Sequence, residues 1–249
     1  MTGTALASPL VEVGGMPFLD DDFADRRLLG AVAAVRHVAG ERAGLASGIT
    51  EAEAEAWLAP ARAFMLRATQ RIPAQPLAPD RLRMIQDVLE ELAADVPAWG
   101  RLVQLPVRYA SLVATSGAIS ASSRAWPQHI LLADEAFSNP AELREQTLHE
   151  LTHQWLYLIQ EVWALQAPDA GTFTLPSGTA GREPAEVLGA ALVAATLLRL
   201  YRTSPGRQPA ERLGRLGAYG AGCLALLADR GEELSDAGRQ IARRLKEAL

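Results

Sequence analysis

Two histidines and a glutamate lie close together in the sequence, as His149, Glu150 and His153. Residues four positions apart on an α-helix lie on one face about one turn apart, so both imidazoles can reach the same ion. Glu150 is rotated about 100° from His149 around such a helix, near enough to act on a metal-bound water. The spacing therefore predicts a divalent metal centre with His149 and His153 as ligands and Glu150 as a catalytic carboxylate. Two histidines on a solvated helix face are the alternative interpretation.

A catalytic metal needs a third protein ligand as well as open coordination positions. Glu186 is the preferred candidate and Glu183 the alternative, since both lie at the start of the next long helix, far enough after His153 for a loop to return that helix against the first. A carboxylate at a helix N-terminus is also favourable without any metal. His37 and His129 lie in no recognisable ligand context.

Two histidines and one carboxylate have two chemical interpretations. With Zn²⁺, Glu150 would serve as general base and the protein would be a peptidase. With Fe²⁺, the same ligands form the facial triad that leaves open positions for a 2-oxo acid and oxygen. The ligand set does not choose between the two metals.

Several segments around this motif resemble one family, the α-ketoglutarate-dependent HExxH-type peptide β-hydroxylases found beside peptide natural-product gene clusters. The matching pieces are Ser116-Gly117-Ala118-Ile119 with Ser123-Arg124, Ile130-Leu131-Leu132, Leu148-His149-Glu150-Leu151-Thr152-His153-Gln154-Trp155-Leu156, Leu175-Pro176-Ser177-Gly178 and Arg182-Glu183-Pro184-Ala185-Glu186-Val187-Leu188-Gly189-Ala190. The chain departs from the family pattern at Gly178, where tryptophan is usual, and at Gly189, where a histidine is often found. Glu186 therefore stays the candidate third ligand.

The resemblance implies that the metal is Fe(II), that 2-oxoglutarate is the cosubstrate, and that a side chain of a ribosomally made precursor peptide is hydroxylated at its β-carbon. A cation must then bind the distal carboxylate of 2-oxoglutarate, and the arginine fork is suited to carboxylates. Arg182 is the first choice for this role and Arg124 the second. A zinc-dependent peptidase and a metal-free module that binds the precursor peptide are the alternative functions.

The elements expected around the motif are mostly helices. The sequence predicts helices from Phe23 to about Gly40, from a Thr50–Glu53 capping box towards Ile72 with a kink at Pro60, and after a cap at Asp80. It also predicts a linker at 72–80, strands at 107–114 and 130–133, and a loop or irregular hairpin at 115–128. Asn139, Pro140 and Glu142 predict the start of the central helix, which carries the motif to about Leu165. Three more helices are expected at 184–201, 208–230 and 235–249.

These elements describe a mostly α, α+β fold in which a small sheet precedes a zincin-like motif helix packed against a ligand-bearing helix. We expect one metalloenzyme domain over 1–249, with a helical N-terminal part (1–98) and a metal-binding part (99–249). The net charge of −5 argues against binding nucleic acid through phosphates. No secretory signal is recognisable and the longest apolar stretch, 190–198, is too short for a membrane span, so a cytoplasmic location without membrane contact is expected.

Overall fold

The structure, a computed structural model, describes residues 8–45, 50–69, 71–72, 74–113, 117–203 and 210–249. Of these residues 61% are helical, and a small mixed sheet of four strands completes the fold, which confirms the α+β class. Backbone contacts divide the chain into two compact units, Asp25–Val162 and a second unit made of Met1–Ala24 with Trp163–Leu249. We call them the sheet unit and the helical unit. That the two form one domain over 1–249 stays a prediction.

The sheet unit contains all four strands, in the order β1-β2-β4-β3. β1 (Ala74–Pro76) pairs antiparallel with β2 (Arg108–Leu112), and β2 pairs parallel with β4 (Trp126–Leu132). β3 (Ser120–Ser123) pairs antiparallel with β4 and forms one edge of the sheet. Its register shifts between Ala121 and Ser123, so the irregular hairpin expected there is confirmed for the residues from 117 onward; residues 114–116 lie outside the described residues.

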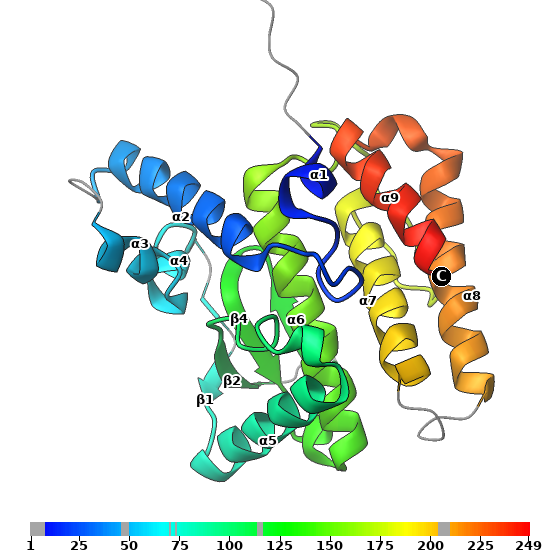
Figure 1. Cartoon of the computed structure of the whole chain (residues 1–249), viewed down its shortest axis with the longest axis horizontal. Helices are drawn as coiled ribbons and strands as arrows, with labels where there is room; N and C mark the ends of the chain where they lie inside the picture. The colour runs from blue at the N-terminus through cyan, green and yellow to red at the C-terminus, as the bar shows by residue number, and fades with distance from the viewer. Residues whose placement is uncertain (1–7, 46–49, 70, 73, 114–116, 204–209) are drawn as a thin grey trace, which may run out of the picture. The chain divides into compact units, whose positions relative to one another are not determined.

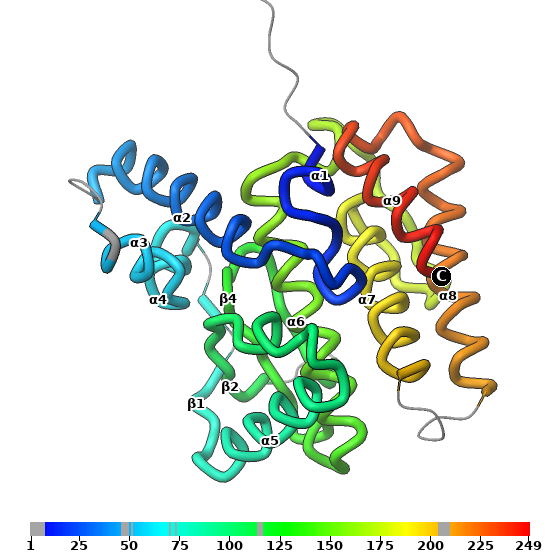
Figure 2. The backbone as a smooth tube through the Cα atoms, in the orientation of Figure 1, coloured from blue at the N-terminus to red at the C-terminus, as the bar shows by residue number. Residues whose placement is uncertain are grey.

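The described residues of the same unit also form five α-helices (Figure 1). They are α2 (Asp25–Arg42), α3 (Glu51–Trp57), α4 (Pro60–Met65), α5 (Pro79–Asp95) and α6 (Pro140–Val162), with 3₁₀ turns at Pro97–Trp99 and Asp134–Phe137. α6 is the central element, because it packs against β3, β4, α2 and α5. Figure 2 shows the chain passing from β4 through the second 3₁₀ turn into α6.

The start of α6 is confirmed as its sequence predicts. The Asn139 side-chain oxygen accepts a hydrogen bond from the backbone N–H of Glu142, at 2.8 Å, and Pro140 occupies the first helical position. This bond satisfies one of the N–H groups that a helix N-terminus leaves without an intrahelical partner. Twelve residues of the helix are buried, which fixes the face that carries the histidines.

Three expectations for the N-terminal half were wrong in detail. The capping box of Thr50 and Glu53 is confirmed, but α3 ends at Trp57 and Pro60 starts α4 instead of kinking one long helix, because proline fits the first helical turn better than the interior. The linker at 72–80 contains β1. Ala78, not Asp80, is the N-cap of α5, and Asp80 lies in its first turn, where a carboxylate favours the helix dipole.

The helical unit contains α1 (Pro9–Val13), α7 (Pro184–Thr203), α8 (Ala210–Asp229) and α9 (Asp236–Ala248), with a 3₁₀ turn at Gly231–Glu233. The last three helices pack against one another and confirm the expected C-terminal helices, although residues 204–209 lie outside the described residues. The loop before α7 is ordered by a backbone bridge between Phe173 and Arg182. α1 was not expected, since five residues give no periodicity.

Helix α7 is long and apolar enough to cross a membrane on length and composition alone, and it is the one such helix found among the described residues. In the folded chain 78% of the residues in this stretch are buried, as they also are in the core helix of a soluble protein. The expectation of no membrane contact stays a prediction.

Candidate metal centre

His149 and His153 lie side by side on α6, with their ring centroids 4.9 Å apart. Their Nε2 atoms are 3.2 Å from each other, within hydrogen-bond distance. Two imidazole nitrogens at about 2.1 Å from one ion and separated by this distance subtend an angle of about 100° at the ion, between the octahedral and tetrahedral values. The spacing of the two nitrogens is therefore compatible with two adjacent positions around one divalent metal.

Tyr157 extends this face of α6 by one further turn. Its ring stacks on that of His153, with centroids 5.9 Å apart and an interplanar angle of 15°. Both residues are half-buried. Tyr157 therefore restricts the orientation of the His153 ring.

Glu150 lies beside the two histidines but points into the sheet unit. Its side chain is 4% exposed, and its Oε1 lies 4.0 Å from the Nε2 of His149. Oε1 accepts a hydrogen bond of 2.6 Å from the hydroxyl of Ser120 on β3. Oε2 is buried and has no hydrogen-bond partner among the described residues. A buried carboxylate oxygen without a donor is costly, and a proton or a cation at this point would offset that cost.

Ser120 joins Glu150 to a polar row on the first turns of α6. The Ser120 hydroxyl is also 2.7 Å from the Oε1 of Gln146, whose amide nitrogen donates to Glu142 at 2.8 Å. A hydroxyl carries one proton, so Ser120 donates to one of its two acceptors at a time. The Glu142 contact fixes the Gln146 amide with its oxygen towards Ser120. The strand β3 thereby fixes the position of the Glu150 carboxylate.

Replacing Ser120 by alanine is expected to destabilise the protein by about 1.5–3 kcal/mol, because the buried Glu150 carboxylate loses its donor. Urea unfolding measures the change. Ser122, in the same strand, is the matched control. Its hydroxyl is buried and has no partner among the residues that the structure describes, so Ser122→Ala should be neutral or stabilising. Equal losses in the two variants would contradict the assigned role of Ser120.

Glu186 and Arg182, the expected third ligand and first-choice 2-oxoglutarate ligand, lie in the helical unit and contact each other. An Nη atom of Arg182 is 2.8 Å from the Oε1 of Glu186, and both side chains are about 40% exposed. The Oε2 of Glu186 accepts a 2.8 Å hydrogen bond from the backbone N–H of Glu183, which is one half of a capping box at the start of α7. Each oxygen keeps a second lone pair. Ligation by Glu186, or by Glu183 instead, stays a prediction.

Arg124 belongs to the same unit as the histidines. It is exposed at the turn between β3 and β4, and its guanidinium contacts the side-chain oxygen of Gln160 at 3.4 Å. Gln160 lies two helical turns past His153 on α6. No carboxylate among the described residues forms an ion pair with Arg124.

The other two histidines have contacts of their own. His37 packs edge-on against the ring of Trp57 and lies 3.5 Å from Glu41. His129 is buried, its Nδ1 donates to the carbonyl of Pro127 at 2.8 Å, and burial lowers its pKa. Across the described ranges, no three His, Cys, Asp or Glu side chains form a group that could hold a metal. His37 and His129 therefore do not complete a site with the other two histidines there.

Sequence reasoning missed Ser120 and Gln146, and it assigned Glu142 only to the start of the helix. Glu142, Gln146 and Glu150 repeat at intervals of four, which places a polar row along one side of a predicted helix. That row was the available signal. Ser120 carries no comparable signal, since it lies among several small residues and only the fold brings it to Glu150.

A comparison of the sequence with protein-family models found no match, and a comparison with curated protein sequences found none either.

Proposed function

We propose that this protein is an Fe(II)- and 2-oxoglutarate-dependent dioxygenase that hydroxylates the β-carbon of a side chain in a ribosomally made peptide. The observation that carries the metal-dependent part is the convergence of the His149 and His153 Nε2 atoms at 3.2 Å. The specific reaction rests on the resemblance of the segments around these histidines to the HExxH-type peptide β-hydroxylases. A cytoplasmic location, with a peptide and no nucleic acid or membrane as partner, belongs to the same proposal.

In this proposal His149 and His153 hold the metal from α6, and Glu186 completes the triad from α7. The ligand-bearing helix would then pack against the motif helix in a zincin-like arrangement. Iron with 2-oxoglutarate and oxygen supplies the oxidising chemistry, which no side chain provides. The protein's own part is to fix the imidazoles, through the stacked ring of Tyr157, and to hold the cosubstrate and the peptide in place.

An arginine is needed for the distal carboxylate of 2-oxoglutarate, and Arg124 has the more suitable contacts. It lies in the unit of the histidines, and the one hydrogen-bond contact of its guanidinium within the described part of the chain is to a neutral amide, at 3.4 Å. Arg182 is already paired with Glu186, so an incoming carboxylate would compete with that ion pair. The proposal therefore favours Arg124 for this role and gives Arg182 the role of orienting Glu186.

A zinc-dependent peptidase with Glu186 as third ligand is the second candidate, and the surroundings of Glu150 favour it. A peptidase of this kind uses a carboxylate beside the metal as general base. The carboxylate of Glu150 lies beside His149, and its Oε2 has no partner among the described residues. A base there would take the proton of a metal-bound water. The hydroxylase has no such step, and in it Glu150 supports the histidines.

The products and the Glu150→Gln variant together separate the two candidates. Purified protein is incubated with iron, 2-oxoglutarate, air and candidate peptides, and the products are analysed by mass spectrometry. We expect a gain of one oxygen in the peptide coupled to formation of succinate. Glu150→Gln should lower this turnover by about 10–100-fold, the range found when groups that support metal ligands are changed. In a peptidase the same change should remove about two or more orders of magnitude from cleavage.

Peptide cleavage that persists without oxygen and without 2-oxoglutarate would replace the hydroxylase with the peptidase. Binding of a precursor peptide by protein that takes up no metal would replace both with a binding module. Arg124→Gln and Arg182→Gln form a matched pair in the same assay. The proposal expects the first to raise the 2-oxoglutarate concentration for half-maximal turnover by more than the second does, because no carboxylate of the described residues pairs with Arg124.

A further inference from the structure

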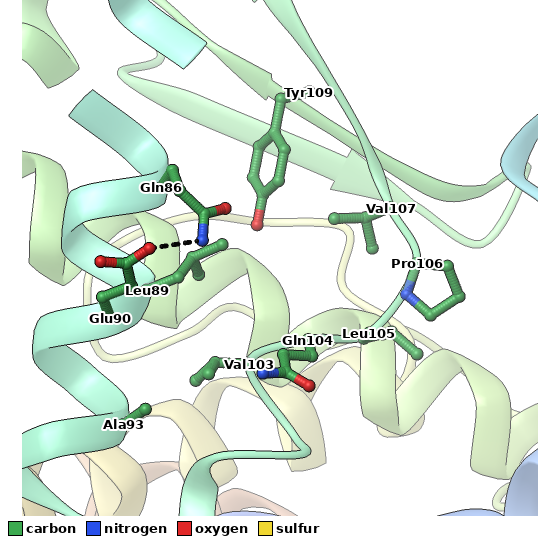
Figure 3. Close-up of a pocket in the computed structure, with 10 residues that line it drawn as sticks. All are labelled: Gln86, Leu89, Glu90, Ala93, Val103, Gln104, Leu105, Pro106, Val107 and Tyr109. Atoms are coloured by element: carbon green, nitrogen blue, oxygen red, sulfur yellow. Dashed lines mark hydrogen bonds between the residues drawn. The ribbon is translucent and has the colours of Figure 1, made fainter. Parts of the chain in front are cut away.

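A groove of about 330 Å³ lies in the sheet unit, apart from the candidate metal centre. One wall is a stripe of α5, and the facing wall is the segment that leads into β2 (Figure 3). The residues that line it are Gln86, Leu89, Glu90, Ala93, Val103, Gln104, Leu105, Pro106, Val107 and Tyr109. None of them belongs to α6 or β3. Its volume lies at the lower end of the range for small-ligand sites, which is about 300–1,000 Å³.

The side chain of Tyr109 projects from β2 into this groove (Figure 3). Its hydroxyl is buried and has no hydrogen-bond partner among the described residues. Burial raises the pKa of the phenol, so the hydroxyl keeps its proton and remains a donor. A buried donor without an acceptor destabilises the free protein, and a bound acceptor would remove that cost. The groove therefore has a donor in place for a ligand oxygen.

The rest of the lining restricts the chemistry of such a ligand. Leu89, Ala93 and Val103 give the groove apolar walls. Gln86 donates its amide N–H to the Oε1 of Glu90 at 2.9 Å, so the polar rim presents a carboxylate and an amide oxygen as acceptors (Figure 3). No lysine or arginine lines the groove within the part of the chain that the structure describes. An anionic ligand would thus meet a carboxylate and no cation.

We propose that this groove binds a peptide group that carries an apolar side chain. The carbonyl of the peptide group accepts a hydrogen bond from the Tyr109 hydroxyl, an N–H donates to Glu90 or Gln86, and the side chain packs against the walls. A peptide group has an acceptor and a donor on opposite sides, which matches a donor at the base of the groove and acceptors at its rim. This inference does not rest on the proposed metal chemistry.

The test is an NMR titration of the full-length, metal-free protein with the probe N-acetyl-leucine N-methylamide. We expect saturable binding at millimolar concentration. Tyr109→Phe should weaken this binding roughly five- to tenfold, the value of one neutral hydrogen bond. The same variant should unfold at an unchanged or higher temperature, because it removes an unpaired buried donor. A purely structural hydroxyl would lower the unfolding temperature instead.

Two control pairs make the test specific. Tyr219 lies on α8 in the helical unit, so Tyr219→Phe should leave the affinity for the probe unchanged. Glu91 lies on α5 outside the groove, so Glu91→Gln should change the affinity by less than Glu90→Gln does. Tighter binding of N-acetyl-Ala-Leu-Ala N-methylamide would identify a segment of a longer peptide as the ligand, and equal binding a small free amide. Each of three results would overturn the proposal. These are no saturation by about 20 mM probe, equal affinity of the wild type and Tyr109→Phe for the probe, and a lowered unfolding temperature of Tyr109→Phe.

Discussion

Replacing either His149 or His153 by alanine is expected to abolish stoichiometric metal binding and, with it, turnover. The two Nε2 atoms converge at 3.2 Å, so each imidazole supplies one of two adjacent coordination positions, and the remaining ligand set is too small to hold an ion tightly. Metal content is measured after anaerobic loading and desalting. Because both side chains are half-buried and line the surface of α6, the variants should stay folded by circular dichroism.

His37→Ala is the matched control for this experiment. His37 lies on α2 and contacts Trp57 and Glu41, so its removal should leave the metal content unchanged. Full metal content in the double variant of His149 and His153, or loss of metal in His37→Ala alone, would contradict the proposed centre.

Replacing Arg36 by methionine is expected to destabilise the protein by about 3 kcal/mol, the lower end of the cost of breaking a buried ion pair, because Arg67 remains 3.4 Å from the Oε2 of Glu161. The guanidinium of Arg36 binds both oxygens of Glu161, at 2.8 and 2.7 Å, and the two side chains are 3% and 2% exposed. It also donates to the carbonyl of Trp57 at 3.0 Å and to the side chain of Gln128. Arg36 on α2 thus connects the C-terminal end of α6, through Glu161, with β4, through Gln128. Urea unfolding monitored by circular dichroism measures the loss.

Two further variants show whether the buried pair is the cause. Arg81 forms an exposed ion pair with Asp134, so Arg81→Met should cost at most about 1 kcal/mol. The double variant Arg36→Met with Glu161→Leu should recover much of the loss, since it removes both buried charges together. A cost of less than about 1 kcal/mol for Arg36→Met, or no recovery in the double variant, would contradict this account.

Local sequence signals predicted the helices that carry the site. The Asn139 cap, Pro140 and Glu142 gave the start of α6, and Thr50 with Glu53 gave the start of α3, because each cap is a bond between residues three apart. β1 could not be predicted in this way. It is three residues long, ends in a proline and exists only because β2 pairs with it.

Contacts between distant residues were beyond sequence reasoning. Ser120 reaches Glu150 across 30 positions, and Arg36 reaches Glu161 across 125. Neither residue type reveals a partner at such a separation, and arginine and glutamate on helices are usually solvated. The same limit applies to Gln128, whose positive φ of 57° and buried side chain are set by its bonds to Arg36 and Gln154.

The central claim is that His149 and His153 hold one divalent metal ion. Its most direct test is an anomalous-diffraction map from crystals of the full chain grown anaerobically with Fe(II), collected on both sides of the iron absorption edge. The account predicts one strong peak at about 2.0–2.2 Å from the Nε2 atoms of both histidines, with a carboxylate oxygen of Glu186 at a similar distance. A peak bound by His37 or His129, or crystals with no peak between His149 and His153, would contradict it.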